Sequence, residues 1–308
     1  MKQVLFLSLV MMLGCDDSGS SNNTNNVNNT NNINNINNIN NVNNLNNVNN
    51  LNNTNNVNNT NNLNPEIFAC PALGAPTGTV VTVSPSQASE LRGIVTAAET
   101  GTTILLEDGF YDMSEGDNVS RLVFATPGVT LRSASGNRDA VTLDGAYLTN
   151  ELVSVYASDV TIADITLTRA YDHPIHVSGS DGNPIEGTLI YNVHVIDPGQ
   201  QGIKINPIGT GYTDYGVVAC SLIELTDDGR GEVRNNCYTG GVDAHMSMGW
   251  TIHSNTFRGF WCETGLSEHA VHLWKTCRDT VVANNTIIDC ARGVGFGLGE
   301  TTETRIYA

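Results

Sequence analysis

The residues best suited to acid–base chemistry lie on two short segments near the end of the chain. Residues 240–246 (GGVDAHM) and 268–274 (EHAVHLW) both alternate apolar and polar residues, which is typical of half-buried strands. Aligned position by position, they place Asp243 beside His272, with His245 two positions further on. Imidazole and carboxylate groups gathered in this way suit proton transfer, because histidine titrates near neutral pH.

Four more segments fit the same strand template, so all six are expected to stack as neighbouring strands about 4.8 Å apart. They begin at Glu151, His173, Gln201 and Arg292. One outward column then reads Ser154, His176, Lys204, Asp243, His272 and Gly295, and the column two residues later reads Tyr156, Ser178, Asn206, His245, Trp274 and Gly297. A column two residues earlier, which includes Gly202 and Gly241, is expected to leave a shallow groove beside the polar columns.

This polar patch has two interpretations. In the functional one, the candidate catalytic residues are Lys204, Asp243, His272, His245 and His176, because crowding can bring the pKa of a lysine down toward those of the histidines. The candidate substrate-binding residues are Trp274, Tyr156 and Asn206. In the structural interpretation the patch is a polar ladder, in which Asp243 bridges Lys204 and His272 only for stability.

The strands that must position these columns are predicted to form a coiled solenoid. A second strand type recurs between copies of the first, beginning at Val160, Thr188, Gly216, Gly249 and Asp279. In this register Asn255 and Asn285 form a ladder, which we expect to satisfy buried backbone groups at a turn. Residues 84–100 have the apolar spacing of a helix. The polar loop 226–239 is expected to overhang the patch.

The order of these elements carries a family resemblance. A helix, then ILLEDGFY, GVTLRSASG and VTLDG, resembles the entrance of a right-handed parallel β-helix of the pectate lyase and chondroitinase B superfamily. The likeness extends over about residues 80–300 and rests on strand pattern, without a diagnostic catalytic motif. It implies an all-β solenoid whose open end is covered by an N-terminal capping helix.

The resemblance also implies chemistry. Enzymes of this shape include polysaccharide lyases, epimerases and hydrolases, and the lyases remove the C5 proton of a uronic acid with Lys or Arg, often beside calcium. On this reading Lys204 is the base, His272 or His245 the acid, and Asp243 orients them. Calcium is the candidate cofactor, although Asp243 is the only acid of the two polar columns. Hydrolysis is less favoured, because the hydrolases use several neighbouring Asp residues.

Two further readings stay open for the patch. One is a non-catalytic carbohydrate-binding or adhesive module, with Trp274 and Tyr156 as stacking platforms. The other is a purely structural surface repeat protein. The chain has no CxxC pair and no HExxH motif, so the sequence assigns no metal site.

The first 64 residues read as an export and tethering segment. Residues 1–15 have one lysine, an apolar run and then Gly-Cys, and the ending MLGC resembles a bacterial lipoprotein signal whose Cys15 is lipidated. An ordinary secretory signal is the alternative. Residues 16–64 form an Asn-rich tether, because Asn-Asn-X repeated fourteen times lacks the apolar mass for a core. A self-associating segment is the second interpretation of this tract.

Residues 65–308 are expected to form the β-helix domain, with its last coil incomplete. The formal net charge of −17 argues against nucleic acid as a partner. The expected partner is a polysaccharide, the only membrane contact a lipid anchor, and the protein a monomer at the outer membrane or cell surface, or alternatively secreted. An even set of cysteines suggests disulfides without fixing their pairing: Cys70, Cys220, Cys237, Cys262, Cys277 and Cys290.

Overall fold

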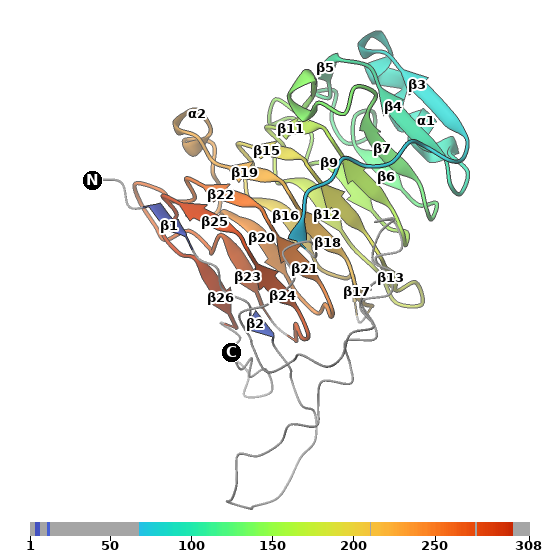
Figure 1. Ribbon diagram of the computed structural model, residues 1–308. Helices are drawn as coiled ribbons and strands as arrows, with labels where there is room; N and C mark the ends of the chain where they lie inside the picture. The colour runs from blue at the N-terminus through green and yellow to red at the C-terminus, as the bar shows by residue number, and fades with distance from the viewer. Residues whose placement is uncertain (1–3, 7–10, 13–67, 210, 275, 298–308) are drawn as a thin grey trace, which may run out of the picture.

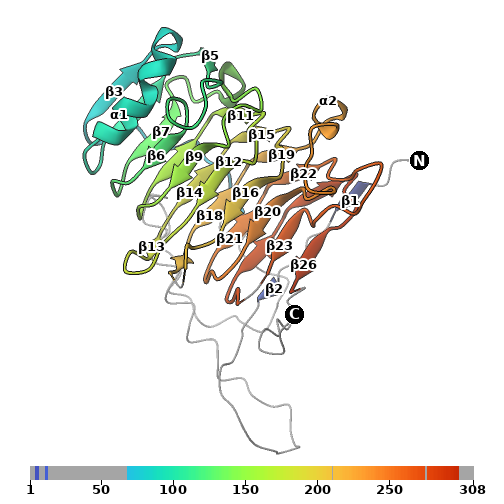
Figure 2. The same cartoon turned by 180° about the vertical axis from the view of Figure 1, so that it is seen from behind.

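The chain winds through three long sheets that form the faces of a solenoid. The computed structural model describes residues 4–6, 11–12, 68–209, 211–274 and 276–297 (Figure 1). From β4 onward, each coil adds one strand to the nine-, eight- and seven-stranded sheets in turn. Neighbouring strands within these coils run parallel, and the same stack is seen from behind in Figure 2. The structure thus confirms the predicted parallel β-helix.

The seven-stranded sheet carries the predicted polar columns. Its strands are β6 (Leu122–Phe124), β9 (Glu151–Val155), β12 (His173–Val177), β16 (Gln201–Ile205), β20 (Gly240–Ala244), β23 (Val271–Leu273) and β26 (Val294–Phe296). Alternate residues of these strands point into the core, where Val153, Ile175, Ile203, Val242 and Val271 are fully buried. These are the residues that the alternation predicted to face inward.

The other two long sheets complete the coils. The nine-stranded sheet comprises β3 (Val80–Val83), β4 (Thr103–Leu106), β7 (Thr130–Ser133), β10 (Thr161–Ala163), β14 (Leu189–Tyr191), β18 (Val217–Ala219), β21 (Thr251–His253), β24 (Val281–Ala283) and β2 (Met11–Met12). The eight-stranded sheet comprises β5 (Gly109–Asp112), β8 (Val141–Asp144), β11 (Thr166–Thr168), β15 (His194–Ile196), β19 (Leu222–Glu224), β22 (Thr256–Arg258), β25 (Thr286–Ile288) and β1 (Val4–Phe6). β1 and β2 pair antiparallel with β25 and β24, and β13 (Ile185–Glu186) pairs with β17 (Thr213–Asp214) in a small separate sheet.

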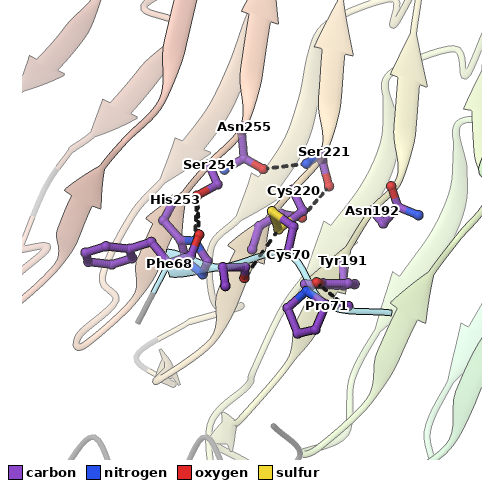
Figure 3. Close-up of a disulfide and its surroundings, with 12 residues drawn as sticks. Phe68, Cys70, Pro71, Tyr191, Asn192, Cys220, Ser221, His253, Ser254 and Asn255 are labelled. Carbon is purple, nitrogen blue, oxygen red and sulfur yellow. Dashed lines mark hydrogen bonds between the residues drawn. A yellow bond between two sulfur atoms is a disulfide. The ribbon is translucent and has the colours of Figure 1, made fainter. Parts of the chain in front are cut away.

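A repeated tight turn joins the nine-stranded sheet to the eight-stranded sheet. One residue per coil takes a left-handed backbone conformation, with φ between 48° and 60°: Asp164, Asn192, Cys220, Ser254 and Asn284. The next position holds the predicted ladder, in which Asn255 Nδ2 donates to Asn285 Oδ1 at 3.0 Å and to the Val218 carbonyl at 2.9 Å. Asn255 Oδ1 in turn accepts from the Ser221 backbone N–H at 3.0 Å (Figure 3). The ladder therefore satisfies buried backbone groups, as predicted.

One short helix closes the end of the solenoid that carries β3. After the 3₁₀ turn Pro85–Glu90, helix α1 (Leu91–Ala97) buries Leu91 and Val95 in the core and contacts β6, the edge of the seven-stranded sheet. This is the helix that the spacing predicted. The short helix α2 (Asp227–Arg230) and the 3₁₀ turn Arg138–Ala140 lie elsewhere, in connections between strands.

A strap formed by residues 68–74 crosses the outside of the nine-stranded sheet. A disulfide joins Cys70 to Cys220, and the Phe68 carbonyl accepts a hydrogen bond from Ser254 Oγ at 2.8 Å (Figure 3). Tyr191 Oη donates to the Pro71 carbonyl at 2.6 Å. The strap therefore spans several coils, and it holds the start of the described domain against the middle of the solenoid.

Among the described residues, no helix has the length and apolar character needed to cross a membrane. Cys15 and the Asn-rich tract lie outside the described residues, as does most of the predicted signal segment.

Candidate functional site

The predicted outward column is present in the strand register. β12, β16, β20, β23 and β26 pair so that His176, Lys204, Asp243, His272 and Gly295 follow one another on successive rungs. Because parallel neighbours stack side chain on side chain, these residues lie against each other without any contribution from loops. Three of them, Lys204, Asp243 and His272, are buried, with 7%, 1% and 4% of their surface exposed.

Asp243 is the centre of this cluster. Its Oδ2 pairs with Lys204 Nζ, and its two oxygens lie 3.1 Å and 3.2 Å from His245 Nε2. Its Oδ1 also lies 3.1 Å from His272 Nδ1. Burial by itself raises the pKa of this carboxyl, but the contacts with His245 and His272 and the charge of Lys204 hold the pKa well below its usual range. Asp243 is therefore ionised, and it gathers three basic side chains.

Lys204 sits among groups that can exchange protons with it. Its Nζ lies 3.3 Å from His245 Nε2 and donates to Tyr238 Oη at 3.3 Å. Tyr238 comes from the loop 226–239, so this loop does overhang the patch as predicted. Burial, followed by Asp243, raises the pKa of Tyr238, although Lys204 opposes the shift. The phenol therefore keeps its proton at neutral pH and can act as a donor.

A disulfide fixes the loop that supplies Tyr238. Cys237, the residue before it, is bonded to Cys262 in the following loop. The structure thus contains two of the expected disulfides, Cys70–Cys220 and Cys237–Cys262, whose pairing the sequence left open.

The aromatic wall of the cluster is Trp274. Its ring meets His245 edge to face, with centroids 4.5 Å apart, and lies nearly parallel to His272 at 6.1 Å. It is half-buried, so part of the indole is accessible beside the cluster. The two histidines differ in access: the side chain of His245 is 16% exposed and that of His272 is 5% exposed. His245 is therefore the better placed of the two to meet a ligand.

His176 belongs to a neighbouring cluster. Its Nδ1 lies 2.6 Å from Glu151 Oε1, and its Nε2 lies 2.8 Å from Asn206 Oδ1. Burial opposes ionisation of Glu151, but the hydrogen bond from His176 and its charge lower the pKa of Glu151 to about 2. Both ring nitrogens are thus occupied by acceptors. The structure joins the two predicted residues His176 and Asn206 to each other and not to Asp243.

Tyr156 lies apart from the other candidates. It follows β9, whereas Trp274 follows β23, four strands away in the same sheet. At about 4.8 Å per strand, this places the two aromatic residues about 19 Å apart. They can share a ligand only if it is long enough to span that distance.

The predicted groove of small residues is wrong. A Cβ on Gly202 would lie 2.8 Å from Ile223, and one on Gly241 would lie 2.4 Å from Phe257, so this column faces the core. The reason is a local break in alternation: Leu152 and the next residue, Val153, are both buried.

The same break explains which residues the sequence pattern missed. In β9 and β12, the polar residue just before the break turns outward. These residues are Glu151 and His173, which are paired neighbours and join the patch. In the coil of β23 the corresponding position holds His269, and Glu268 comes just before it; both lie beside His272. Two consecutive core-type residues at the start of each strand were the signal that could have revealed this column.

The site does not suit calcium. Calcium prefers six to eight oxygen ligands. The partners of the Asp243 carboxylate here are an ammonium and imidazole nitrogens, from Lys204, His245 and His272. An ammonium in direct contact with the carboxylate repels a cation, so the residues of this cluster do not fit calcium.

The fold and the site together define a parallel β-helix protein with a buried acid–base cluster on the outer face of its seven-stranded sheet. No protein-family model and no curated protein matches the chain. Among solved structures it is similar to a PL6 family alginate lyase, at 13% identity and a TM-score of 0.42. That match covers 76% of this chain, which spans 39% of the lyase chain.

Two pectin methylesterase structures are similar at a lower level. One, in complex with a hexasaccharide, has 8% identity and a TM-score of 0.32, covering 74% of this chain and 92% of its own. The other, PemA from Erwinia chrysanthemi, has 10% identity and a TM-score of 0.25, covering 75% and 93%.

Proposed function

We propose that this is a surface-anchored carbohydrate-active protein, and that the Asp243 cluster acts as a lyase or epimerase on a uronate-containing polysaccharide. The observation that carries the proposal is the setting of Lys204. Its buried amine lies within 3.3 Å of both a phenol and an imidazole, and it is paired with a carboxylate. Such a set can remove a proton, hold it and return it.

The lyase reaction is an elimination. A base takes the proton from C5, the electron pair forms a double bond between C4 and C5, and the C4–O bond breaks with the leaving oxygen taking a proton from an acid. In the epimerase reaction, the proton is instead returned to C5 on the opposite face. Both reactions use one base and one acid on a fixed frame.

The geometry supports definite roles. Lys204 is the base, and His245 Nε2 is placed to take its proton before the reaction. His245 or Tyr238 is the acid, because both are more accessible than His272. Asp243 orients Lys204 and His245. Trp274 offers a flat apolar surface on which a sugar ring can stack.

The proposed setting of this site is outside the cell. The signal-like residues 1–15, Cys15 as lipid attachment point and the Asn-rich tract support a lipoprotein whose β-helix is held off a membrane by a tether. The strap at residues 68–74 is where such a tether would join the solenoid.

The test is a panel of acidic polysaccharides. Lyase activity is read from the ultraviolet absorbance of the new double bond, and epimerase activity from incorporation of solvent deuterium at C5. We expect Lys204→Met to lower kcat by about 10²–10⁴-fold, and Tyr238→Phe or His245→Gln by a smaller factor. Arg258→Ala is the control, because Arg258 is half exposed on the eight-stranded sheet, away from the cluster.

The competing interpretations give different outcomes. A wild-type protein that binds a glycan yet forms no product and exchanges no deuterium is a binding module, with Trp274 as its platform. If the wild-type protein neither binds a glycan nor forms a product, the polar residues serve only as a structural ladder.

A further inference from the structure

A second cluster lies at β23, next to Asp243, and shares His272 with the Asp243 cluster. It consists of Glu268, His269 and His272, whose donor atoms all lie within 4.8 Å of one another. Glu268 Oε2 lies 3.5 Å from His272 Nδ1 and 3.8 Å from His269 Nδ1. Two donors that bind one zinc ion at about 2.1 Å in a tetrahedral site lie about 3.4 Å apart, so these separations are close to those of a metal site.

The facing atoms of this cluster lack hydrogen bonds. Glu268 Oε2, His269 Nδ1 and His272 Nδ1 are buried, and none of the three forms a hydrogen bond. His272 is 4% exposed, and although its Nδ1 lies 3.1 Å from Asp243 Oδ1, the two are not aligned for a hydrogen bond. Buried polar atoms nearly always have a hydrogen bond, so three that lack one and face one another indicate a ligand that can bind all three.

The outer contacts prepare His272 for a metal ion. Its other nitrogen, Nε2, lies 2.9 Å from the Gly297 carbonyl, which can only accept a proton. The ring therefore carries a proton on Nε2, and Nδ1 is the nitrogen that faces Glu268 and Asp243. A ring N–H donated to a backbone carbonyl is the usual second contact of a metal-binding histidine. Asp243 adds a negative charge beside the same nitrogen.

The backbone leaves room for this arrangement. A Cβ on Gly295, on the next strand, would lie 2.3 Å from the ring of His269, so only glycine lets the ring lie there. The side chain of Glu268 is 21% exposed, which gives an ion a path from solvent. Arg292 Nη1 lies 3.9 Å from Glu268 Oε2, beyond hydrogen-bond distance, and its side chain is 28% exposed, so it can move aside.

We propose that Glu268, His269 and His272 bind one divalent transition-metal ion of the zinc type. Two imidazoles and one carboxylate form a donor set that suits zinc and its neighbours and that calcium does not favour. Three protein ligands leave a fourth position for water or an anionic group. The site is separate from Lys204, and the proposal holds whether or not the Asp243 cluster is catalytic.

The test uses the full chain purified without a polyhistidine tag. Zn²⁺ is titrated by calorimetry, and Co²⁺ by its visible absorption, which reports on the ligands directly. We expect one ion per chain and no competition from Ca²⁺. Loss of an outer contact usually weakens metal binding about 10–100-fold, so removal of a ligand in His269→Ala or Glu268→Gln is expected to weaken it at least about 100-fold.

Two further variants make the test specific. Gly295→Ala removes no donor but displaces the His269 ring, and we expect it to weaken Zn²⁺ binding about 10-fold or more. His194→Ala is the matched control, because His194 is also paired with a carboxylate, Glu224 at 2.9 Å, but on the eight-stranded sheet. The proposal is overturned if the wild type binds no Zn²⁺ and shows no Co²⁺ spectrum. It is equally overturned if folded His269→Ala and Gly295→Ala bind Zn²⁺ as the wild type does.

Discussion

Asp243 bridges basic side chains from three rungs of one sheet. Its negative charge holds these side chains in place, whether or not they take part in a reaction. Lys204, His245 and His272 all approach the same carboxylate, which is 1% exposed. Removing one member of a buried charge network leaves its partners unpaired in a medium that solvates them poorly. The stability of the patch therefore depends on Asp243 more than on any of its partners.

We expect Asp243→Asn to lower the free energy of unfolding by about 3–5 kcal/mol, because the buried Lys204 ammonium loses its counter-charge. Urea unfolding at neutral pH measures this loss. The control is Asp228→Asn, since Asp228 is exposed and its replacement should change stability by less than about 0.5 kcal/mol. Equal stabilities for the two variants would contradict the bridging role.

Glu151 predicts the acid sensitivity of the neighbouring cluster. Its pKa in the fold is about 2, below the ordinary value of 4.5, because of His176. A carboxyl with a lowered pKa stabilises the fold fully above its unfolded value and loses that contribution as the pH falls. Stability should therefore decline from about pH 4.5 toward pH 2, and Glu151→Gln should flatten this decline. Urea midpoints across that range give the answer, and an unchanged slope in the variant would rule the idea out.

At the scale of the elements, the turn between two sheets holds the coils in register. Each coil repeats a left-handed residue, and in three coils the next residue is a ladder residue: Ser221, Asn255 or Asn285. An error in register would misplace every coil after it. Asn255 is central because its amide contacts the coil before and the coil after.

We expect Asn255→Ala to cost at least about 2 kcal/mol, since it leaves the Ser221 N–H without its partner in the interior and removes the hydrogen bond to the Val218 carbonyl. Thermal or denaturant unfolding measures this cost. Asn183→Ala is the comparison, because Asn183 is exposed and its side chain donates a hydrogen bond to the Tyr156 carbonyl. A ladder without energetic importance would make the two variants alike.

The strand register was predictable, whereas the bend at the start of each strand was not. Alternation of apolar and polar residues placed Lys204, Asp243 and His272 in one column, because a side-chain period of two leaves a single register that buries every apolar residue. The inward turn of Gly202 and Gly241 depends on packing against residues of other sheets, such as Ile223 and Phe257. Tyr238 was missed for a similar reason: a disulfided loop sets its position, and no periodic pattern does.

At the scale of the whole molecule, the Cys70–Cys220 disulfide closes a sequence separation of 150 residues. The chain-entropy relation gives about 5 kcal/mol for a loop of that length, and measured values are commonly lower. We expect Cys70→Ala to lower the free energy of unfolding by about 2–5 kcal/mol. This variant keeps Cys220, whose φ of 60° makes substitution there costly for separate reasons.

Guanidinium unfolding of Cys70→Ala beside Cys290→Ala tests this expectation, because Cys290 takes part in neither disulfide. A loss below about 1 kcal/mol for Cys70→Ala would show that the strap adds little to the fold. The sequence predicted disulfides from the even number of cysteines, but Cys70 and Cys220 become neighbours only when the strap lies across the coils, which no local pattern encodes.

The same strap decides how the molecule carries mechanical load. A pull on the chain ahead of Phe68 reaches the solenoid through a covalent sulfur–sulfur bond at Cys220, in its middle coils. The force is then shared between strands on both sides of that coil and does not peel β3 from the end one hydrogen bond at a time. When the disulfide is reduced, the load falls first on the end of the solenoid, where strands can separate one after another. The oxidation state of the Cys70–Cys220 pair therefore sets the tension at which the coils open.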